Sequence, residues 1–247
     1  MKPRRLRVVL AEHFGITYDE AGDIIRANRV KVNDASPTVT RLIVQEDVIT
    51  VYGNVIPNRV QLAYLLFNKP RGIECTMNED IPSNLLSVFR FHLRLFPVGR
   101  LDKDSEGLLL MINDGDLYHE IAHADSGKEK EYYVEVHKPV TEDFLQLMRD
   151  GVKVLNTMTD PCEVFAVPEN NHAFRIILKQ GMNRQIRRMS YNLGFSVHKL
   201  VRTRIMHLHL ANLQAGEWRE LTSDELQPLL QLKESGNSFG SNFHRTL

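Results

Sequence analysis

A polar loop bounded by two glycines carries residue types suited to chemistry. It reads Gly99-Arg-Leu-Asp102-Lys-Asp-Ser-Glu-Gly107 and leads into the apolar segment 108–112. A carboxylate just before a buried strand is held by rigid scaffold yet open to substrate, as catalytic groups often are. Asp102 is therefore a candidate nucleophile or general base. A polar turn before a strand explains the same pattern equally well.

A second candidate is a cluster of arginines in the segment Gln180-Gly-Met-Asn-Arg-Gln-Ile-Arg-Arg-Met189. Arg184, Arg187 and Arg188 stand at i, i+3 and i+4, which places them on one face of a predicted helix. Three arginines repel one another unless an anion faces them. Nucleic-acid phosphates, a carboxylate such as Asp102, or both would meet that need.

A third candidate is His119-Glu-Ile-Ala-His123, which matches the H-E-x-x-H pattern of zinc hydrolases. The extended form of that motif requires a further histidine, but Glu129 occupies its place. A distant carboxylate such as Glu142 remains open as a third ligand. Zinc binding is thus a remote alternative, and chance occurrence the main interpretation.

The first sixty residues predict a small module that precedes the segments with the candidate chemistry. Apolar spacing predicts a helix from Leu6 to Phe14 that Gly15 ends, and Thr17 with Glu20 forms a capping box for the next helix. Alternating residues then predict short strands at 30–32, 39–44 and 48–51, with a turn at 33–34 and a linker at 57–59.

The remainder predicts a larger domain in which strands and helices do not alternate regularly. Strands are expected at 64–67, 108–112, 132–136, 163–167, 174–179, 197–201 and 206–213, and helices at 116–124, 141–150, 183–193 and 223–230. This order favours an α+β fold with a mixed, largely antiparallel sheet. Residues 233–247 are rich in Ser, Gly and Asn and predict a flexible tail.

Charge is balanced overall but not locally. Lys and Arg number 31, as do Asp and Glu, so the formal net charge is zero. Residues 102–150 hold 13 acidic and 5 basic side chains, whereas 179–204 hold 7 basic and no acidic ones. The basic stretch suits an anionic polymer. Alternatively, it neutralises the acidic stretch within the fold.

Several classes of protein do not fit the sequence. The longest apolar stretches, such as 63–67, are far too short to span a bilayer. The basic N-terminus is not followed by the uninterrupted apolar run of a secretory signal. Cys75 and Cys162 are too few for a disulfide framework or a metal ribbon. We therefore expect a reducing, cytoplasmic compartment.

Taken together, the motifs resemble the RsuA family of pseudouridine synthases. The resemblance rests on the loop at 99–107, the Lys130-Glu-Tyr132 strand start, the helix at 183–189 and the Lys199-Leu-x-Arg-x-Arg204 strand, in that order along the chain. It covers residues from about 4 to 230. Gly72-Ile-Glu-Cys-Thr-Met77 and Gly216-Glu-Trp-Arg219 resemble a branch that modifies 23S rRNA and also tRNA-Tyr.

The resemblance implies a fold and a chemistry. It implies an S4-type RNA-binding domain at 1–57, a catalytic domain at 60–232, no cofactor or metal, and a monomer that acts on RNA. Asp102 would be the catalytic carboxylate, which initiates exchange of the N1–C1′ bond of uridine for a C5–C1′ bond. Tyr132 would stack on the uracil, Arg187 would pair with Asp102, and Arg100 would face RNA. A noncatalytic RNA-binding protein is the main alternative.

Further basic side chains complete the expected interface with RNA. Where S4-type domains commonly begin their second helix with basic residues, this chain has Tyr18-Asp-Glu20, so its RNA contacts would fall elsewhere. We expect substrate contacts from Arg184 and Lys199, and wider RNA contacts from Arg4, Arg5, Arg26, Arg29, Lys31, Arg188, Arg202 and Arg204.

Overall fold

The computed structural model describes residues 3–58, 61–122 and 127–240, with the backbone alone for 234–240. The chain divides into two compact units. The first comprises Met1–Leu62 with Phe91–Arg94, and the second comprises Ala63–Arg90 with Leu95–Leu247. Each unit has its own buried apolar core, so each is described separately below.

The first unit combines two helices with short strands. Its elements are β1 (Arg4–Arg5), α1 (Leu6–Phe14), α2 (Tyr18–Arg26), β2 (Val30–Val32), β3 (Leu42–Ile43), β4 (Ile49–Val51) and β5 (Asn54–Ile56). Gly15 ends α1 in the left-handed conformation, and the capping box of Thr17 and Glu20 is present. Both predictions are confirmed. The strands form a β2-β4-β5 sheet and a β1-β3 pair.

The second unit is built on one mixed sheet of nine strands, ordered β12-β13-β9-β14-β8-β6-β16, with β15 on β14 and β7 on β8. Only β14 and β8 run parallel; the other described pairs are antiparallel, as the sequence predicts. The strands are β6 (Tyr64–Lys69), β7 (Phe96–Val98), β8 (Glu106–Ile112), β9 (Lys130–Val136), β12 (Glu163–Ala166), β13 (Ala173–Leu178), β14 (Val197–Ile205), β15 (Leu208–His209) and β16 (Trp218–Glu220).

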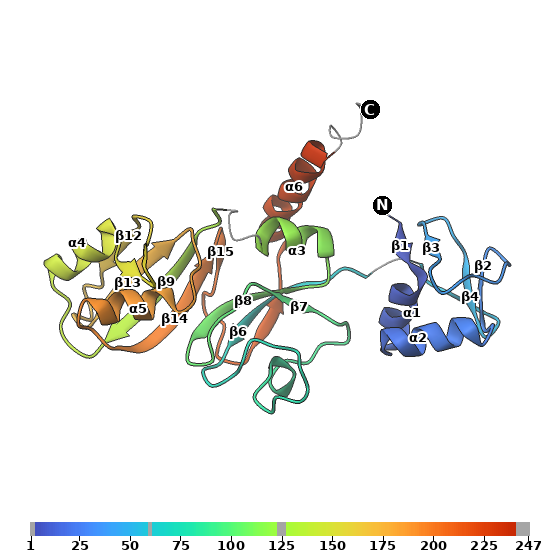
Figure 1. The fold of residues 1–247 in the computed structure, drawn as a ribbon, viewed down its shortest axis with the longest axis horizontal. Helices are drawn as coiled ribbons and strands as arrows, with labels where there is room; N and C mark the ends of the chain where they lie inside the picture. The colour runs from blue at the N-terminus through green and yellow to red at the C-terminus, as the bar shows by residue number, and fades with distance from the viewer. Residues whose placement is uncertain (1–2, 59–60, 123–126, 241–247) are drawn as a thin grey trace. The chain divides into compact units, whose positions relative to one another are not determined.

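Helices cover the two halves of this sheet separately (Figure 1). On one half, α4 (Glu142–Asp150) and α5 (Gln185–Asn192) pack their apolar side chains onto β9, β12, β13 and β14. On the other, α3 (Gly115–Ala122) and α6 (Ser223–Gly240) cover β6, β7 and β8. A hairpin of β10 (Lys153–Val154) and β11 (Thr157–Met158) and a 3-10 turn, η1 (Leu85–Ser87), complete the unit.

The last helix is longer than the sequence predicts. We expected it to end at Leu230, but α6 continues to Gly240, into the segment expected to be a tail. Lys233 is the first residue of the segment predicted to be a tail. Its ammonium is within 2.8 Å of the buried Asp114 carboxylate at the start of α3. This ion pair stabilises a turn of α6 that composition alone disfavours. Residues 241–247 lie outside the described part of the chain.

None of the helices that the structure describes is long and apolar enough to cross a membrane.

Candidate functional site

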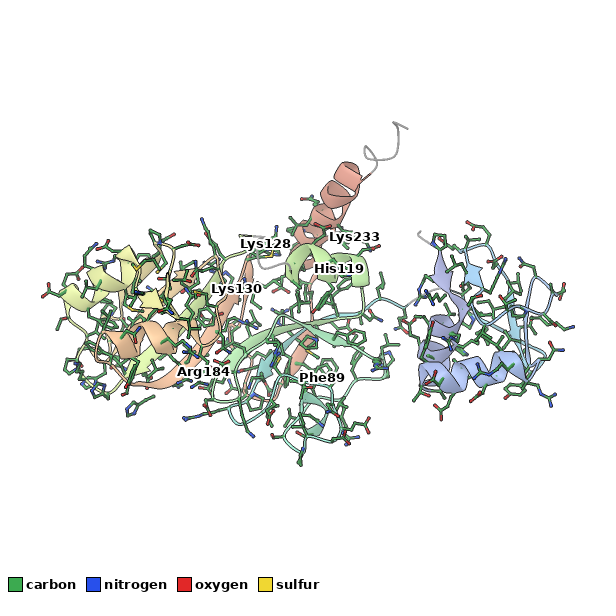
Figure 2. The ribbon with its side chains drawn as sticks, viewed as in Figure 1. Phe89, His119, Lys128, Lys130, Arg184 and Lys233 are labelled. Atoms are coloured by element: carbon green, nitrogen blue, oxygen red, sulfur yellow. The ribbon has the colours of Figure 1, made fainter. Side chains whose placement is uncertain are left out.

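A central cleft of about 530 Å³ lies in the second unit, where the two halves of the sheet meet. Its walls come from the start of α5 and the face of β9 and β14 on one side, and from α3 on the other. The loop at residues 99–107, here called the Asp102 loop, forms its edge. Segments far apart in the sequence therefore surround one cavity, and Lys128, Lys130 and Arg184 can be located around it in Figure 2.

Hydrogen bonds hold the Asp102 loop in a fixed shape. The Ser105 amide donates to the carbonyl of Asp102 at 3.0 Å and closes a turn, and the Gly72 amide donates to the carbonyl of Lys103 at 2.8 Å. Ser105 is buried, whereas the Asp102 side chain keeps 30% of its surface exposed. The loop thus presents one carboxylate to the cleft from a rigid support, as the sequence analysis expects.

The buried Lys69 holds the turn that contacts the Asp102 loop. Its ammonium donates to the carbonyls of Pro70 and Ile73 at 2.8 and 2.7 Å and so shapes the turn that contains Gly72. Burial lowers the pKa of Lys69 to about 8. A buried cation held by two neutral acceptors is costly while it keeps its proton.

This cost predicts a pH dependence of stability. Between pH 8 and 10.5 the unfolded chain still binds a proton that folded Lys69 has lost, so the free energy of unfolding rises with pH. From pH 7.5 to 9.5 we expect wild type to gain about 2 kcal/mol relative to Lys69→Met, measured by urea unfolding. A difference between the two proteins that does not change with pH would contradict this account.

Arg184 is the cation nearest the Asp102 carboxylate. Its guanidinium lies 3.9 Å from Asp102 and 3.6 Å from Asp104. Arg184 immediately precedes α5 and has a φ of 51°, a left-handed conformation that is uncommon for a residue with a side chain. Such backbone strain is found mostly at functional sites, where the surrounding structure enforces it.

Arg187 occupies a different place from the one implied by the family resemblance. It donates to the carbonyls of Asp104 at 2.9 Å and Val197 at 3.2 Å, and therefore ties the Asp102 loop to the start of β14. Burial and then the neighbouring Arg184 lower the pKa of Arg187. The expected ion pair between Arg187 and Asp102 is wrong in this structure, because Arg184 takes that position and Arg187 holds main chain instead.

The face of β9 and β14 contributes Tyr132, Lys130 and Arg202. Tyr132 pairs with Arg202 across the two strands, and Lys130 lies two residues before Tyr132, on the same face. Burial lowers the pKa of Lys130, and Arg202 adds to that effect. The sequence analysis placed Tyr132 in the site but missed Lys130, which the alternation of side chains along a strand would have indicated.

The charge of the cleft is one-sided. Among its described lining residues, Asp102 is the single carboxylate, and the basic side chains are Arg100, Lys128, Lys130, Arg184 and Arg202. Arg100, Lys128 and Arg184 reach the surface and suit the binding of a polyanion, since each can neutralise a phosphate. A lone carboxylate among these cations opposes that binding, so its presence calls for a chemical role.

Three basic residues that the sequence analysis assigned to substrate or RNA contacts are not exposed cations of the cleft. Lys199 is exposed on β14 and does not line the cleft. Arg204 pairs with Glu129 and Glu131 at 3.2 and 3.0 Å and is largely buried, so these carboxylates already neutralise the side chain that we expected to contact RNA. Part of the basic stretch therefore neutralises the acidic stretch within the fold, which was the alternative left open. Arg202 is 2% exposed, so it faces the cleft from the core rather than an open surface.

The basic residues of the first unit are mostly at its surface. Arg4 and Arg26 pair with Glu12 and Asp23, while Arg5, Arg29 and Lys31 are exposed. The sequence analysis did not include Arg7 among the basic residues of this unit. Its guanidinium lies 3.7 Å from the centre of the Tyr18 ring, a cation–π contact between α1 and α2.

The histidine pair of the zinc pattern is only partly described. His119 is exposed on α3, and His123 lies outside the described residues. Within the described part of the chain, no three His, Cys, Asp or Glu side chains gather as a metal site would require.

Comparisons with known proteins agree on one family. A family model described as RNA pseudouridylate synthase matches residues 63–191. The chain is 41% identical over 236 residues to the dual-specificity RNA pseudouridine synthase RluF of Escherichia coli K12, covering 95% of this chain and 81% of that protein. It is 31% identical over 244 residues to the ribosomal large subunit pseudouridine synthase B of Bacillus subtilis, covering 95% and 98%.

A solved structure gives the same result. The crystal structure of a pseudouridylate synthase matches with a TM-score of 0.64 at 30% identity, and the match covers 91% of this chain and 99% of the other.

Proposed function

Because the chain belongs to the RNA pseudouridylate synthase family, we propose that Asp102 is the carboxylate with which it converts uridine to pseudouridine in RNA. The observation that carries this assignment is the isolation of Asp102 among five cations of the central cleft. A protein that only bound RNA would gain nothing from a carboxylate there, because it repels phosphate. A synthase requires one.

The reaction is an isomerisation in which every atom is retained. The N1–C1′ bond breaks, the uracil turns within the cleft, and a C5–C1′ bond forms. The proton on C5 leaves and N1 gains one. Asp102 initiates the exchange as nucleophile or base, and the Arg184 guanidinium lies 3.9 Å from its carboxylate.

The other residues of the cleft bind and orient the flipped nucleotide. A uridine must leave its stack to enter the cavity, and an aromatic face stabilises it there. Tyr132 supplies that face, since it lines the cleft beside Arg202. Arg100 is exposed at the edge of the cleft, where it meets the RNA backbone. Arg187 acts indirectly, by fixing the main chain of the Asp102 loop.

We propose 23S rRNA as a substrate and tRNA-Tyr as a second one. Two relatives, a dual-specificity RNA pseudouridine synthase and a pseudouridine synthase of the large ribosomal subunit, support rRNA and a second RNA as substrates. The choice of tRNA-Tyr rests on the resemblance of residues 72–77 and 216–219. Pseudouridine mapping in total RNA from cells with and without the gene tests it. We expect sites in both RNAs to disappear with the gene. If pseudouridine is lost from neither RNA, the assigned substrates are wrong.

We propose that residues 1–57 form an S4-type RNA-binding domain attached to a catalytic domain at 60–232. Two packed helices, one with its own capping box, support the assignment, as do the exposed basic residues Arg5, Arg29 and Lys31. RNA as substrate supports a cytoplasmic location, and we propose a monomer because one chain supplies the whole described cleft.

Deletion of residues 1–57 tests this proposal. We expect the truncated protein to bind RNA more weakly while its rate on saturating substrate changes little, because the central cleft lies within the second unit. The slope of log Kd against log salt falls by about 0.7 to 0.9 for each phosphate contact removed. Filter binding over a salt series measures it. An unchanged slope would show that these residues do not contact RNA.

A further inference from the structure

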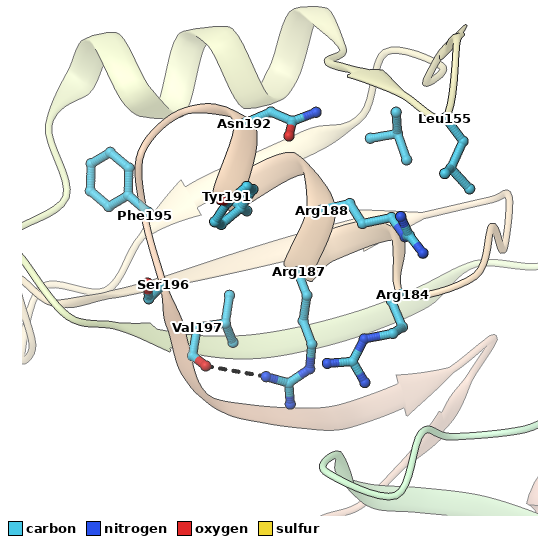
Figure 3. Close-up of a pocket in the computed structure, with 10 residues that line it drawn as sticks. Leu155, Arg184, Arg187, Arg188, Tyr191, Asn192, Phe195, Ser196 and Val197 are labelled. Carbon is cyan, nitrogen blue, oxygen red and sulfur yellow. Dashed lines mark hydrogen bonds between the residues drawn. The ribbon is translucent and has the colours of Figure 1, made fainter.

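A second groove, here called the α5 groove, lies on the outer face of α5. Its volume is about 530 Å³, and α5, the turn between β10 and β11, and residues 195–197 line it. Arg184, Arg187 and Arg188 enter it from α5 and the residue before it, and no described lining residue is a carboxylate (Figure 3). The groove is therefore suited to an anion.

An aromatic ring accompanies the arginines. Tyr191 lies one turn beyond Arg187 on α5 and lines the groove (Figure 3). The residue is 76% exposed to solvent. An aromatic side chain is rarely so exposed at a protein surface. An exposed ring beside arginines is the combination that binds single-stranded nucleic acids, because bases stack on the ring and phosphates meet the cations.

The opposite wall of the groove is a tight hairpin fixed to the helix. Leu155 and Asn156 form the two-residue turn between β10 and β11, and both have positive φ angles, 50° and 66°, as a type I′ turn requires. The turn leaves the Leu155 side chain 59% exposed. Asn192 of α5 donates to the carbonyl of Lys153 at 2.6 Å and so fixes the hairpin against the helix.

The α5 groove and the central cleft share one lining residue, Arg184. Arg188 has capacity for a phosphate. Its Nε and Nη2 donate to the carbonyl and side chain of Asn183, and no described residue accepts a hydrogen bond from its Nη1. A strand that leaves the cleft past Arg184 thus meets a cation and then a stacking surface.

We propose that the α5 groove binds a nucleotide of the RNA substrate adjacent to the target uridine, with its base on Tyr191 and a phosphate at Arg188. This inference rests on the proposed function, since it takes the strand in the central cleft to be RNA. It assigns the chain a second base-binding site, distinct from the one at Tyr132.

Binding of a short, fluorescein-labelled oligouridine to the full chain tests the proposal. We expect Tyr191→Ala to raise Kd about 5- to 100-fold, the usual effect of losing one base–aromatic stack. Tyr191→Phe keeps the ring and binds like wild type. Phe165→Ala is the matched control, because Phe165 is 43% exposed on β12 and lines neither cavity. Thermal unfolding confirms that each variant is folded.

A salt series provides a second readout. Arg188→Gln lowers the slope of log Kd against log salt by about 0.7, the value for one phosphate contact on a single strand. Oligouridine affinity that is unchanged in Tyr191→Ala, or a slope that is unchanged in Arg188→Gln, would overturn the proposal. That result is separable from failure of the proposed function, in which wild-type protein forms no pseudouridine in RNA at all.

Discussion

Replacing Gly107 with alanine is expected to disable the protein, although glycine carries no reactive group. Gly107 lies at the start of β8 with a φ of 110°, and an added Cβ would lie 2.4 Å from the carbonyl oxygen of Arg202 on the parallel strand β14. Neither backbone can move freely, because both strands lie in the middle of the sheet. We expect a loss of about 3 kcal/mol or more in the free energy of unfolding.

Activity is expected to fall further than stability alone requires. Arg202 donates to the carbonyls of Leu108 and Arg100, on either side of Asp102, so a displaced strand also displaces the carboxylate. A misplacement of about 1 Å in a catalytic group can cost about 100-fold in rate. Tritium release from RNA that contains 5-tritiated uridine, below the unfolding temperature, measures this loss.

Gly99→Ala is the matched control, because it lies in the same loop with a φ of 74° but has no atom within 4 Å of an added Cβ. This variant has the cost of a positive φ without a steric clash, so we expect its free energy of unfolding to fall by about 1 kcal/mol. If Gly107→Ala is as stable and as active as Gly99→Ala, close packing of β8 on β14 does not position the Asp102 loop.

Local chemical signals made several elements predictable. Gly15 and the capping box at Thr17 set the ends of α1 and α2, and α4 lies within the predicted segment 141–150. Strands β5, β7, β10, β11 and β16 were missed, because two or three residues are too few to show a period. β16 pairs with the distant β6, which no local pattern reveals, whereas β5 pairs with the preceding β4, and β10 with β11, through tight turns.

The candidate site was predictable in its residue types but not in its pairings. Asp102 and Tyr132 stand at positions that motifs mark, and both line the central cleft. Arg184 precedes Arg187 by about one turn, and helical spacing alone does not indicate that Arg184, which has a left-handed conformation before α5, is the one near the Asp102 carboxylate. The sequence analysis assigned Arg204 to RNA because local spacing does not reveal its ion-pair partners, Glu129 and Glu131, which lie at the start of another strand.

Asp102→Asn is expected to have the largest effect on chemistry of any single change. The amide keeps the shape of the side chain and removes its charge and nucleophilicity, so we expect a rate loss of at least about 10⁴-fold with the fold intact. RNA affinity stays the same or rises, because Arg184 loses one of the two carboxylates near it and becomes available to phosphate.

Asp104→Asn is the matched control for this variant. Asp104 lies in the same loop and is closer to Arg184, at 3.6 Å, but its side chain is 53% exposed and does not line the cleft. Its replacement removes the same charge from the loop, and we expect a rate within about fivefold of wild type, as for the loss of an exposed ion pair.

The most direct test of the central claim is a single-turnover measurement of pseudouridine formation by these two variants beside wild type. Saturating protein is mixed with substrate RNA, and tritium release and the pseudouridine content of digested RNA are followed in the same samples. We predict product from wild type and Asp104→Asn and none from Asp102→Asn, although Asp102→Asn still binds the RNA. Pseudouridine formation by Asp102→Asn at near the wild-type rate would contradict the assignment of Asp102 as the catalytic carboxylate.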